Sequence, residues 1–261
     1  MYRRFRSRES LPPGVGLLFR GVANGDAESV RQSLATLPPD YSLCYNEGDL
    51  AIHVAATRGH RDRMACDDDA LGDTDLDSKS PCAAGEPLVE QPCGGCLIIH
   101  LLAAHEPKCL RAGSGSGFSA LHVAVQRGPL CAIRALIAAG ADVLTRKEYH
   151  AHGGGPARSE TFATPLHIAA REARVEAVHI MLARAPAAVH TVDRRGWTPL
   201  HYVAHFGRGR AATLTAIALM AAGANPAAAA GDNSTPQALT AARAEVLHDQ
   251  ELSELRLALG G

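Results

Sequence analysis

Short apolar stretches bounded by small or turn-forming residues recur along the chain, and four of them align. They are 48–60 (GDLAIHVAATRGH), 117–128 (GFSALHVAVQRG), 162–172 (FATPLHIAARE) and 196–207 (GWTPLHYVAHFG). Each ends near a turn, and each is followed by a second apolar segment, such as 130–143 after the second of them. Repetition of one short unit predicts a repeat protein in which helix pairs pack on their neighbours.

The last of these segments has the residues that start and stop a helix. Thr198 suits an N-cap because its hydroxyl can accept a hydrogen bond from an amide of the first turn. Pro199 fits the first helical position, where its missing N–H costs nothing. Glycines such as Gly128 and Gly140 suit helix ends, because a left-handed conformation is needed there. The predicted unit is therefore helix, turn, helix and an extended finger.

The aligned segments resemble the ankyrin repeat, most closely at Thr164-Pro165-Leu-His167 and Thr198-Pro199-Leu-His201. The resemblance implies an all-α ankyrin-repeat solenoid of about six helix–turn–helix repeats with β-hairpin-like fingers. It also implies a structural role for one histidine in each repeat, whose imidazole hydrogen-bonds backbone groups and links neighbouring repeats. These marker histidines are His53, His122, His167 and His201.

The spacing of the marker histidines predicts two insertions. His167 and His201 are 34 residues apart, close to one repeat, whereas the two preceding gaps are 69 and 45 residues. We interpret the first gap as an acidic, cysteine-containing loop at 61–95 that interrupts one repeat before its second helix. We assign the second gap to an enlarged finger at 147–160.

The expected organisation has degenerate repeats at both ends. A disordered basic tail covers 1–13, capping repeats cover 14–46 and 231–261, and the repeats between them cover 47–112, 113–146, 161–193 and 194–230.

The resemblance further implies non-catalytic binding of another protein through the concave face formed by fingers and first helices. Trp197 stands beside two arginines, and both residue types are enriched at interface hot spots. This neighbourhood favours a partner segment with carboxylates and an apolar anchor. The candidate partner-binding residues are Arg58, Phe118, Gln126, Arg127, Arg171, Glu172, Arg194, Arg195, Trp197, His205 and Phe206.

Charge and composition narrow the classes of partner. Lys and Arg number 26 against 27 Asp and Glu, which gives no general argument for nucleic acid or an anionic membrane. The alanine-rich stretch 211–230 is broken by glycine and proline, so it is a poor membrane span. We expect a monomeric cytoplasmic protein, with the nucleus as the alternative location, and no catalytic residues or cofactor.

The spacing of one cysteine pair is typical of a zinc site, but the spacing of the other cysteines argues against one. Cys93-Gly-Gly-Cys96 has the spacing of half a zinc site, but Cys66 and Cys82 form no second close pair. His60 could complete the ligand set. With only one pair, we expect no bound metal.

A second class of function rests on the N-terminal segment. Leu11-Pro-Pro13 followed by apolar residues is similar to the start of an F-box, which would make the chain a substrate-recognition adaptor of a ubiquitin ligase. The peptide 23–30 already fits the first repeat, and one peptide cannot serve both packings.

Overall fold

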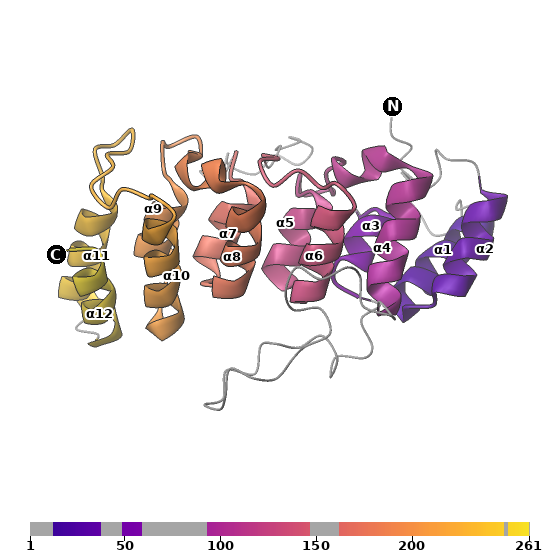
Figure 1. Ribbon diagram of the computed structural model, residues 1–261, viewed down its shortest axis with the longest axis horizontal. Coiled ribbons are helices and arrows are strands. Elements are labelled where there is room, and N and C mark those ends of the chain that lie inside the picture. Colours follow the sequence, from indigo (N-terminus) through magenta and orange to yellow (C-terminus); the bar gives the residue numbers. More distant parts are fainter. Residues whose placement is uncertain (1–12, 38–48, 59–92, 147–161, 248–249, 261) are drawn as a thin grey trace. The chain divides into compact units, whose positions relative to one another are not determined.

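The computed structural model describes residues 13–37, 49–58, 93–146, 162–247 and 250–260. Helices follow one another in pairs, as Figure 1 shows. The chain divides into two compact units, 1–142 and 143–261. The helical fold class predicted from the repeat pattern is confirmed in both units.

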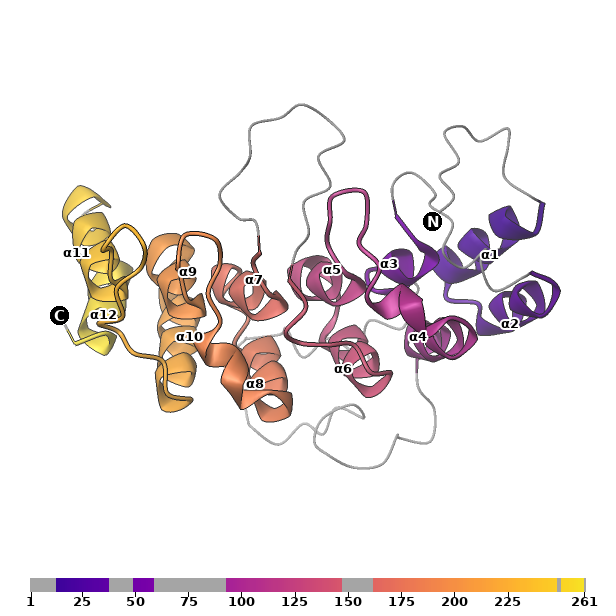
Figure 2. The same cartoon turned by 90° about the horizontal axis from the view of Figure 1, so that it is seen from above.

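In its described residues the first unit contains three helix pairs. They are α1 (Pro13–Asn24) with α2 (Ala27–Thr36), α3 (Ala51–Ala55) with α4 (Gly94–His105), and α5 (Ala120–Arg127) with α6 (Leu130–Ala138). A 3-10 turn, η4 (Pro107–Leu110), follows α4. The first helices of the pairs pack on one another in order, and so do the second helices. The result is two helical layers, which Figure 2 shows from above.

The second unit repeats this arrangement. Its pairs are α7 (Pro165–Arg171) with α8 (Val175–Arg184), α9 (Pro199–Phe206) with α10 (Gly209–Ala221), and α11 (Pro236–Leu247) with α12 (Gln250–Ala258). The 3-10 helix η5 (Pro186–His190) follows α8. Helices α7, α9 and α11 form one layer, and α8, α10 and α12 form the other. Thr164 and Thr198 are the N-caps of α7 and α9, with proline at the first helical position.

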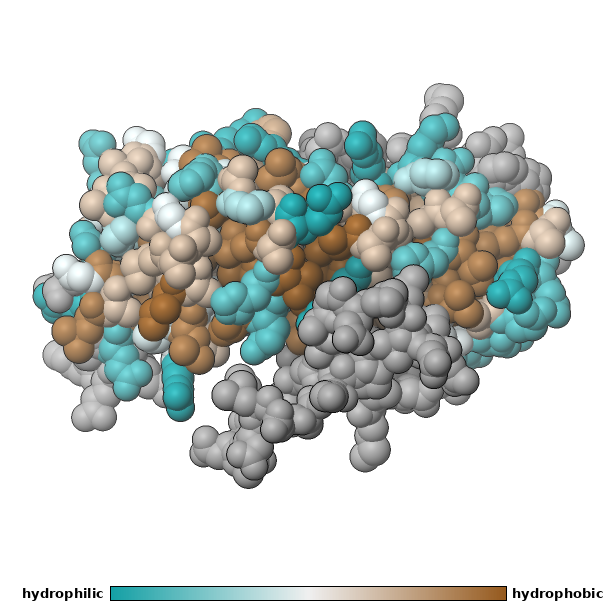
Figure 3. Space-filling model, in the orientation of Figure 1, coloured by the Kyte–Doolittle hydropathy of each residue, from teal (hydrophilic) through white to brown (hydrophobic). Residues whose placement is uncertain are grey.

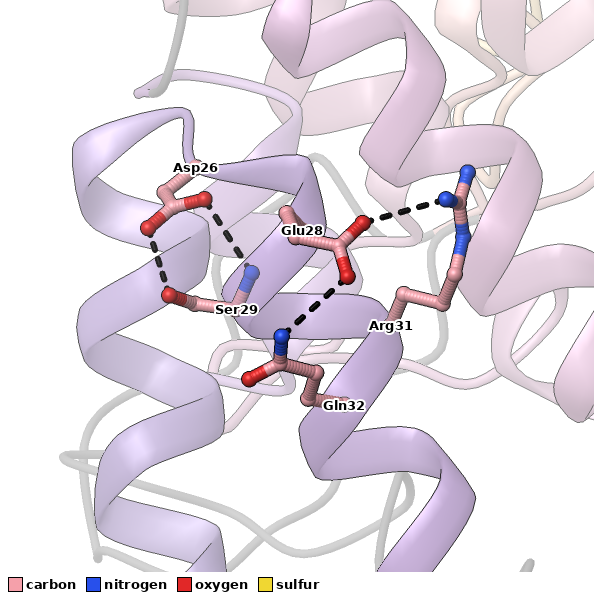
Figure 4. A network of polar contacts seen from close by, with 5 residues as sticks. All are labelled: Asp26, Glu28, Ser29, Arg31 and Gln32. Carbon is pink, nitrogen blue, oxygen red and sulfur yellow. Dashed lines mark hydrogen bonds and ion pairs between the residues drawn. The ribbon is translucent and has the colours of Figure 1, made fainter.

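A network of exposed polar side chains lies along the start of α2 (Figure 4). Asp26 caps α2 by accepting hydrogen bonds from the backbone N–H and the hydroxyl of Ser29. Glu28 accepts from Arg31 and from Gln32, each at 3.1 Å, one turn further along the helix. Because α1 and α2 pack on α3 and α4 as a repeat-type pair, the F-box hypothesis gains no support from this segment.

Close packing between repeats depends on small residues, and Gly128 is a clear case. A Cβ atom at Gly128 would lie 2.2 Å from the carbonyl oxygen of Ala56, in the preceding repeat. We expect Gly128→Ala to destabilise the protein by about 1–3 kcal/mol, since the backbone must shift to make room. Urea unfolding followed by circular dichroism measures the change.

Gly16→Ala is the matched control, because its Cβ would meet nothing within 4 Å. In the interior of α1 this change is expected to stabilise by up to about 1 kcal/mol through helix propensity. Equal effects of the two substitutions would contradict the steric argument.

Candidate protein-binding surface

The fingers are tight hairpin turns of one shape. The backbone N–H of the first finger residue donates to the carbonyl four residues later in three fingers, over 2.7–3.0 Å. These pairs are Ser114 with Phe118, Asp193 with Trp197, and Ala230 with Ser234. Each turn contains a residue with positive φ, namely Gly117 (79°), Gly196 (80°) and Asn233 (60°). Glycine and asparagine are the residues that adopt this conformation most readily.

The marker histidines bond to the start of their own helix, and three of them also bond to the finger of the following repeat. In all four, Nδ1 accepts from the backbone N–H of the N-cap residue, so Nε2 carries the proton; in His53, His167 and His201 it donates to a finger carbonyl. The Nε2 partners are the carbonyls of Phe118 for His53 (2.8 Å), of Trp197 for His167 (3.0 Å) and of Ser234 for His201 (3.2 Å). The N-cap donors are Leu50, Thr164 and Thr198. His122 accepts in the same way from Ser119.

These bonds require neutral imidazoles, and burial keeps them neutral. Burial lowers the pKa of His167 to about 4, although the carbonyl of Trp197 partly opposes the shift. Burial also lowers the pKa values of His53 and His201. The four histidines lie in separate repeats and serve the backbone of the scaffold.

Buried Asp193 fixes the finger at 193–197. One carboxylate oxygen accepts from the backbone N–H groups of Arg195 (2.8 Å) and Trp197 (2.9 Å). The other accepts from the hydroxyl of Tyr202 on α9 at 3.0 Å. Because its turn is anchored to α9, the finger presents the exposed side chains of Arg194 and Arg195 from a rigid base.

Trp197 belongs to this base, which corrects the role inferred for it from the sequence. Its side chain is only 4% exposed. The indole ring stacks on His201 and lies edge-on to Tyr202 and His205, at centroid distances of 6.1, 6.0 and 5.0 Å. The Arg195 guanidinium covers the ring at 5.3 Å. Trp197 therefore supports the finger from within, and a partner would meet the groups above it.

The other candidates of the second unit do reach the surface. Arg194, Arg195, His205 and Glu172 are exposed, and Arg171 and Phe206 are half-buried. The Arg171 guanidinium lies 5.1 Å above the Phe206 ring, and its Nε is 3.8 Å from a Glu172 carboxylate oxygen. His205 packs edge-on against Phe206 with centroids 4.5 Å apart.

Phe162 is a surface residue that the sequence analysis missed. It precedes the Ala-Thr-Pro-Leu-His motif at the position where Gly196 precedes the equivalent motif. It adopts φ of 76°, which is strained for a bulky side chain, and it remains 36% exposed. The Arg194 guanidinium lies 5.2 Å above its ring. The sequence signal that could have identified it is a phenylalanine at the position where the equivalent finger has glycine.

We call the surface formed by Phe162, Arg171, Arg194, Arg195, His205 and Phe206 the arginine–aromatic face. Its surroundings are cationic. Burial lowers the pKa of His205, and the nearby positive charges of Arg243 and Arg195 lower it further. Arg243 is held at the end of α9, where it donates to the carbonyls of Ala204 (2.6 Å) and Gly207 (2.9 Å). The face is thus suited to carboxylates and planar apolar groups.

The remaining candidates lie in the first unit. Arg58 and Arg127 are exposed near the ends of α3 and α5, while Phe118 and Gln126 are half-buried. Phe118 packs tilted against His122 with ring centroids 5.8 Å apart. His60, Cys66 and Cys82 lie outside the described residues, as does the predicted enlarged finger at 147–160. Among the helices that the structure describes, none has both the length and the apolar character of a membrane span.

Comparisons with known proteins agree with the repeat geometry. A family model of the ankyrin repeat matches residues 116–148, and a model of ankyrin repeats in many copies matches 166–214. The nuclear factor NF-kappa-B p105 subunit of Gallus gallus is 32% identical over 131 residues, which cover 49% of this chain and 12% of that protein. The same subunit of Mus musculus is 29% identical over 187 residues, covering 72% of this chain and 14% of that protein.

The chain therefore spans only a small part of the length of these curated relatives. Among solved structures, a chain in the complex of the Bd0816 predatory endopeptidase from Bdellovibrio bacteriovorus with immunity protein Bd3460 is similar in fold. Its TM-score is 0.60 at 18% identity, with 93% of this chain and 96% of that chain covered.

Proposed function

Because this chain is a member of the ankyrin-repeat family, we propose that it is a non-catalytic module that binds another protein through its arginine–aromatic face. Stacked repeats expose a continuous surface of fingers and first helices while their frame stays fixed. In the second unit this surface carries three arginines, three aromatic or imidazole rings and the rigid finger that positions them.

Phe162 is the observation that carries this proposal. A phenylalanine in the left-handed region costs about 1–3 kcal/mol, and such strain is concentrated at functional sites. Burial of this residue is incomplete, since 36% of it remains exposed. The ring instead forms a surface platform under Arg194. A contact role for Phe162 accounts for a bulky residue at a backbone position that glycine adopts without strain.

The arginines define the chemistry of the partner. Guanidinium groups placed over aromatic rings have N–H donors that can pair bidentately with carboxylates. Arg195 over Trp197 and Arg171 over Phe206 are held in this way. We therefore assign to this face an acidic polypeptide segment with an aromatic or aliphatic anchor that packs beside Phe162 and His205.

Selection from a random peptide display library, with the full chain immobilised, tests the assignment. We expect enrichment of peptides rich in Asp and Glu around one large apolar residue. Arg195→Ala and His205→Ala should each weaken a selected peptide by about tenfold or more, a free-energy cost typical of interface residues that matter. Binding should also weaken with added salt, because charge pairs at an exposed face are screened.

Two control variants separate this surface from general charge and stability effects. Arg184→Ala removes an exposed arginine of α8, in the other helical layer, and should leave affinity unchanged. Phe162→Gly should weaken binding, yet lower the free energy of unfolding by less than the roughly 3–5 kcal/mol typical of a deleted core phenylalanine, because it relieves the strained φ. Neutral selected peptides, or equal loss of binding in Arg184→Ala, would refute the proposed face.

A further inference from the structure

Three cysteines of the first unit gather at one point between α4 and α6. They are Cys93, which precedes α4, Cys96 in its first turn, and Cys131 in the first turn of α6. All three sulfur atoms lie within 4.8 Å of one another. The Sγ atom of Cys93 is 3.1 Å from that of Cys96 and 3.9 Å from that of Cys131.

Backbone packing fixes this cluster. Cys93 is the N-cap of α4, and Cys96 is the third residue of that helix, so the first helical turn brings both side chains to the same side. Gly94 between them cannot be replaced by a larger residue without a backbone shift, because an added Cβ would lie 2.2 Å from the carbonyl oxygen of Gly25. Helices α4 and α6 pack together, and this packing brings Cys131 to the pair.

We propose that Cys93, Cys96 and Cys131 form a three-thiolate site for a thiophilic d10 metal ion, either Zn²⁺ or Cu⁺. A zinc ion bound by sulfur has Zn–S distances of about 2.3 Å, which place tetrahedral ligand atoms about 3.8 Å apart. The Cys93–Cys131 separation of 3.9 Å matches that value, and the Cys93–Cys96 separation of 3.1 Å is shorter. All-sulfur ligand sets favour zinc and monovalent copper over harder cations. On binding, the metal replaces the thiol protons, which pass to solvent.

Two features favour binding at this place. The amides at the start of a twelve-residue helix stabilise thiolates at its N-cap and first turn. Cys93 is half-buried while Cys96 and Cys131 are buried, so an ion could enter from the Cys93 side and leave one coordination position for water. The sequence showed only a single Cys-x-x-Cys pair, because its third ligand lies 35 residues beyond Cys96.

The test uses the full chain with Cys44, Cys66 and Cys82 changed to serine, because those residues lie outside the described part of the chain. The reduced, metal-free protein is titrated with Zn²⁺ against a chromophoric chelator, and anaerobically with Cu⁺ against a copper(I) chelator. We expect one equivalent of one of these ions to bind. Cobalt(II) substitution should give thiolate-to-cobalt charge-transfer absorption.

Cys131→Ser should weaken binding by more than the roughly 10–100-fold loss typical of outer-shell changes, because it removes a direct ligand. Cys109→Ser is the matched control. Cys109 is also buried, but its Sγ contacts the carbonyl of Leu102 and lies outside the cluster, so this variant should bind as before. Cys131→Ala provides a second variant if the serine change prevents folding, which circular dichroism monitors.

Three outcomes would overturn the site. The first is that the protein binds neither ion more tightly than does a variant that lacks all three cluster cysteines. The second is equal affinity in Cys131→Ser and the control. The third is a Cys93–Cys96 disulfide, detected by mass, whose reduction restores no metal binding.

Discussion

Replacing Trp197 with alanine is expected to lower the free energy of unfolding by about 3–5 kcal/mol, the range for large aromatic side chains deleted from a core. The ring contacts His201, Tyr202 and His205, so its loss leaves a cavity between the finger and α9. Trp197 is the only tryptophan of the chain, so unfolding of the variant must be followed by circular dichroism.

Leu214→Ala is the control for this experiment. Leu214 lies on α10 and is 39% exposed. Figure 3 shows apolar side chains at the surface over α10. Exposed substitutions of this kind usually change stability by less than about 0.5 kcal/mol. A Trp197→Ala variant as stable as Leu214→Ala would show that the indole ring is not part of the core, and would restore it as a contact candidate.

Acid should destabilise the fold through the marker histidines. His167 has a pKa of about 4 in the folded chain, compared with 6.5 for the unfolded side chain. Above pH 6.5 the imidazole is neutral in both states, and its full contribution is present. Between pH 6.5 and 4 the unfolded state binds more protons, so stability falls as the pH is lowered. At 1.36 kcal/mol per pKa unit, His167 alone accounts for a loss of about 3 kcal/mol by pH 4.

The lowered pKa values of His53 and His201 act in the same direction and steepen the loss. Urea unfolding at a series of pH values between 7 and 4 measures the slope. His167→Gln should flatten that slope, although it also lowers stability at pH 7 by removing the bond to the Trp197 carbonyl. His179→Gln, at an exposed position of α8, is the matched control. Identical slopes in all three proteins would contradict the assignment.

The sequence by itself determined the helix pairs and their capping. The Thr-Pro pairs at 164–165 and 198–199 predict a helix start from the local sequence alone, because an N-cap hydroxyl and a proline act within one turn. The expected delayed helix at Cys96 corresponds to α4, which begins two residues earlier at Gly94. The marker histidines were also predictable, since each bonds to the start of its own helix and three of them also bond to the next repeat in a fixed register.

Only the tertiary structure decided which side chains are buried and which distant residues meet. Trp197 and the two arginines beside it are residue types typical of a hot spot. Contacts from α9 nevertheless enclose Trp197, because burial depends on neighbours that the local sequence does not specify. The strain at Phe162 became visible only with its backbone angle. Cys131 joined Cys93 and Cys96 because α6 packs on α4, and no spacing rule relates residues brought together by helix packing.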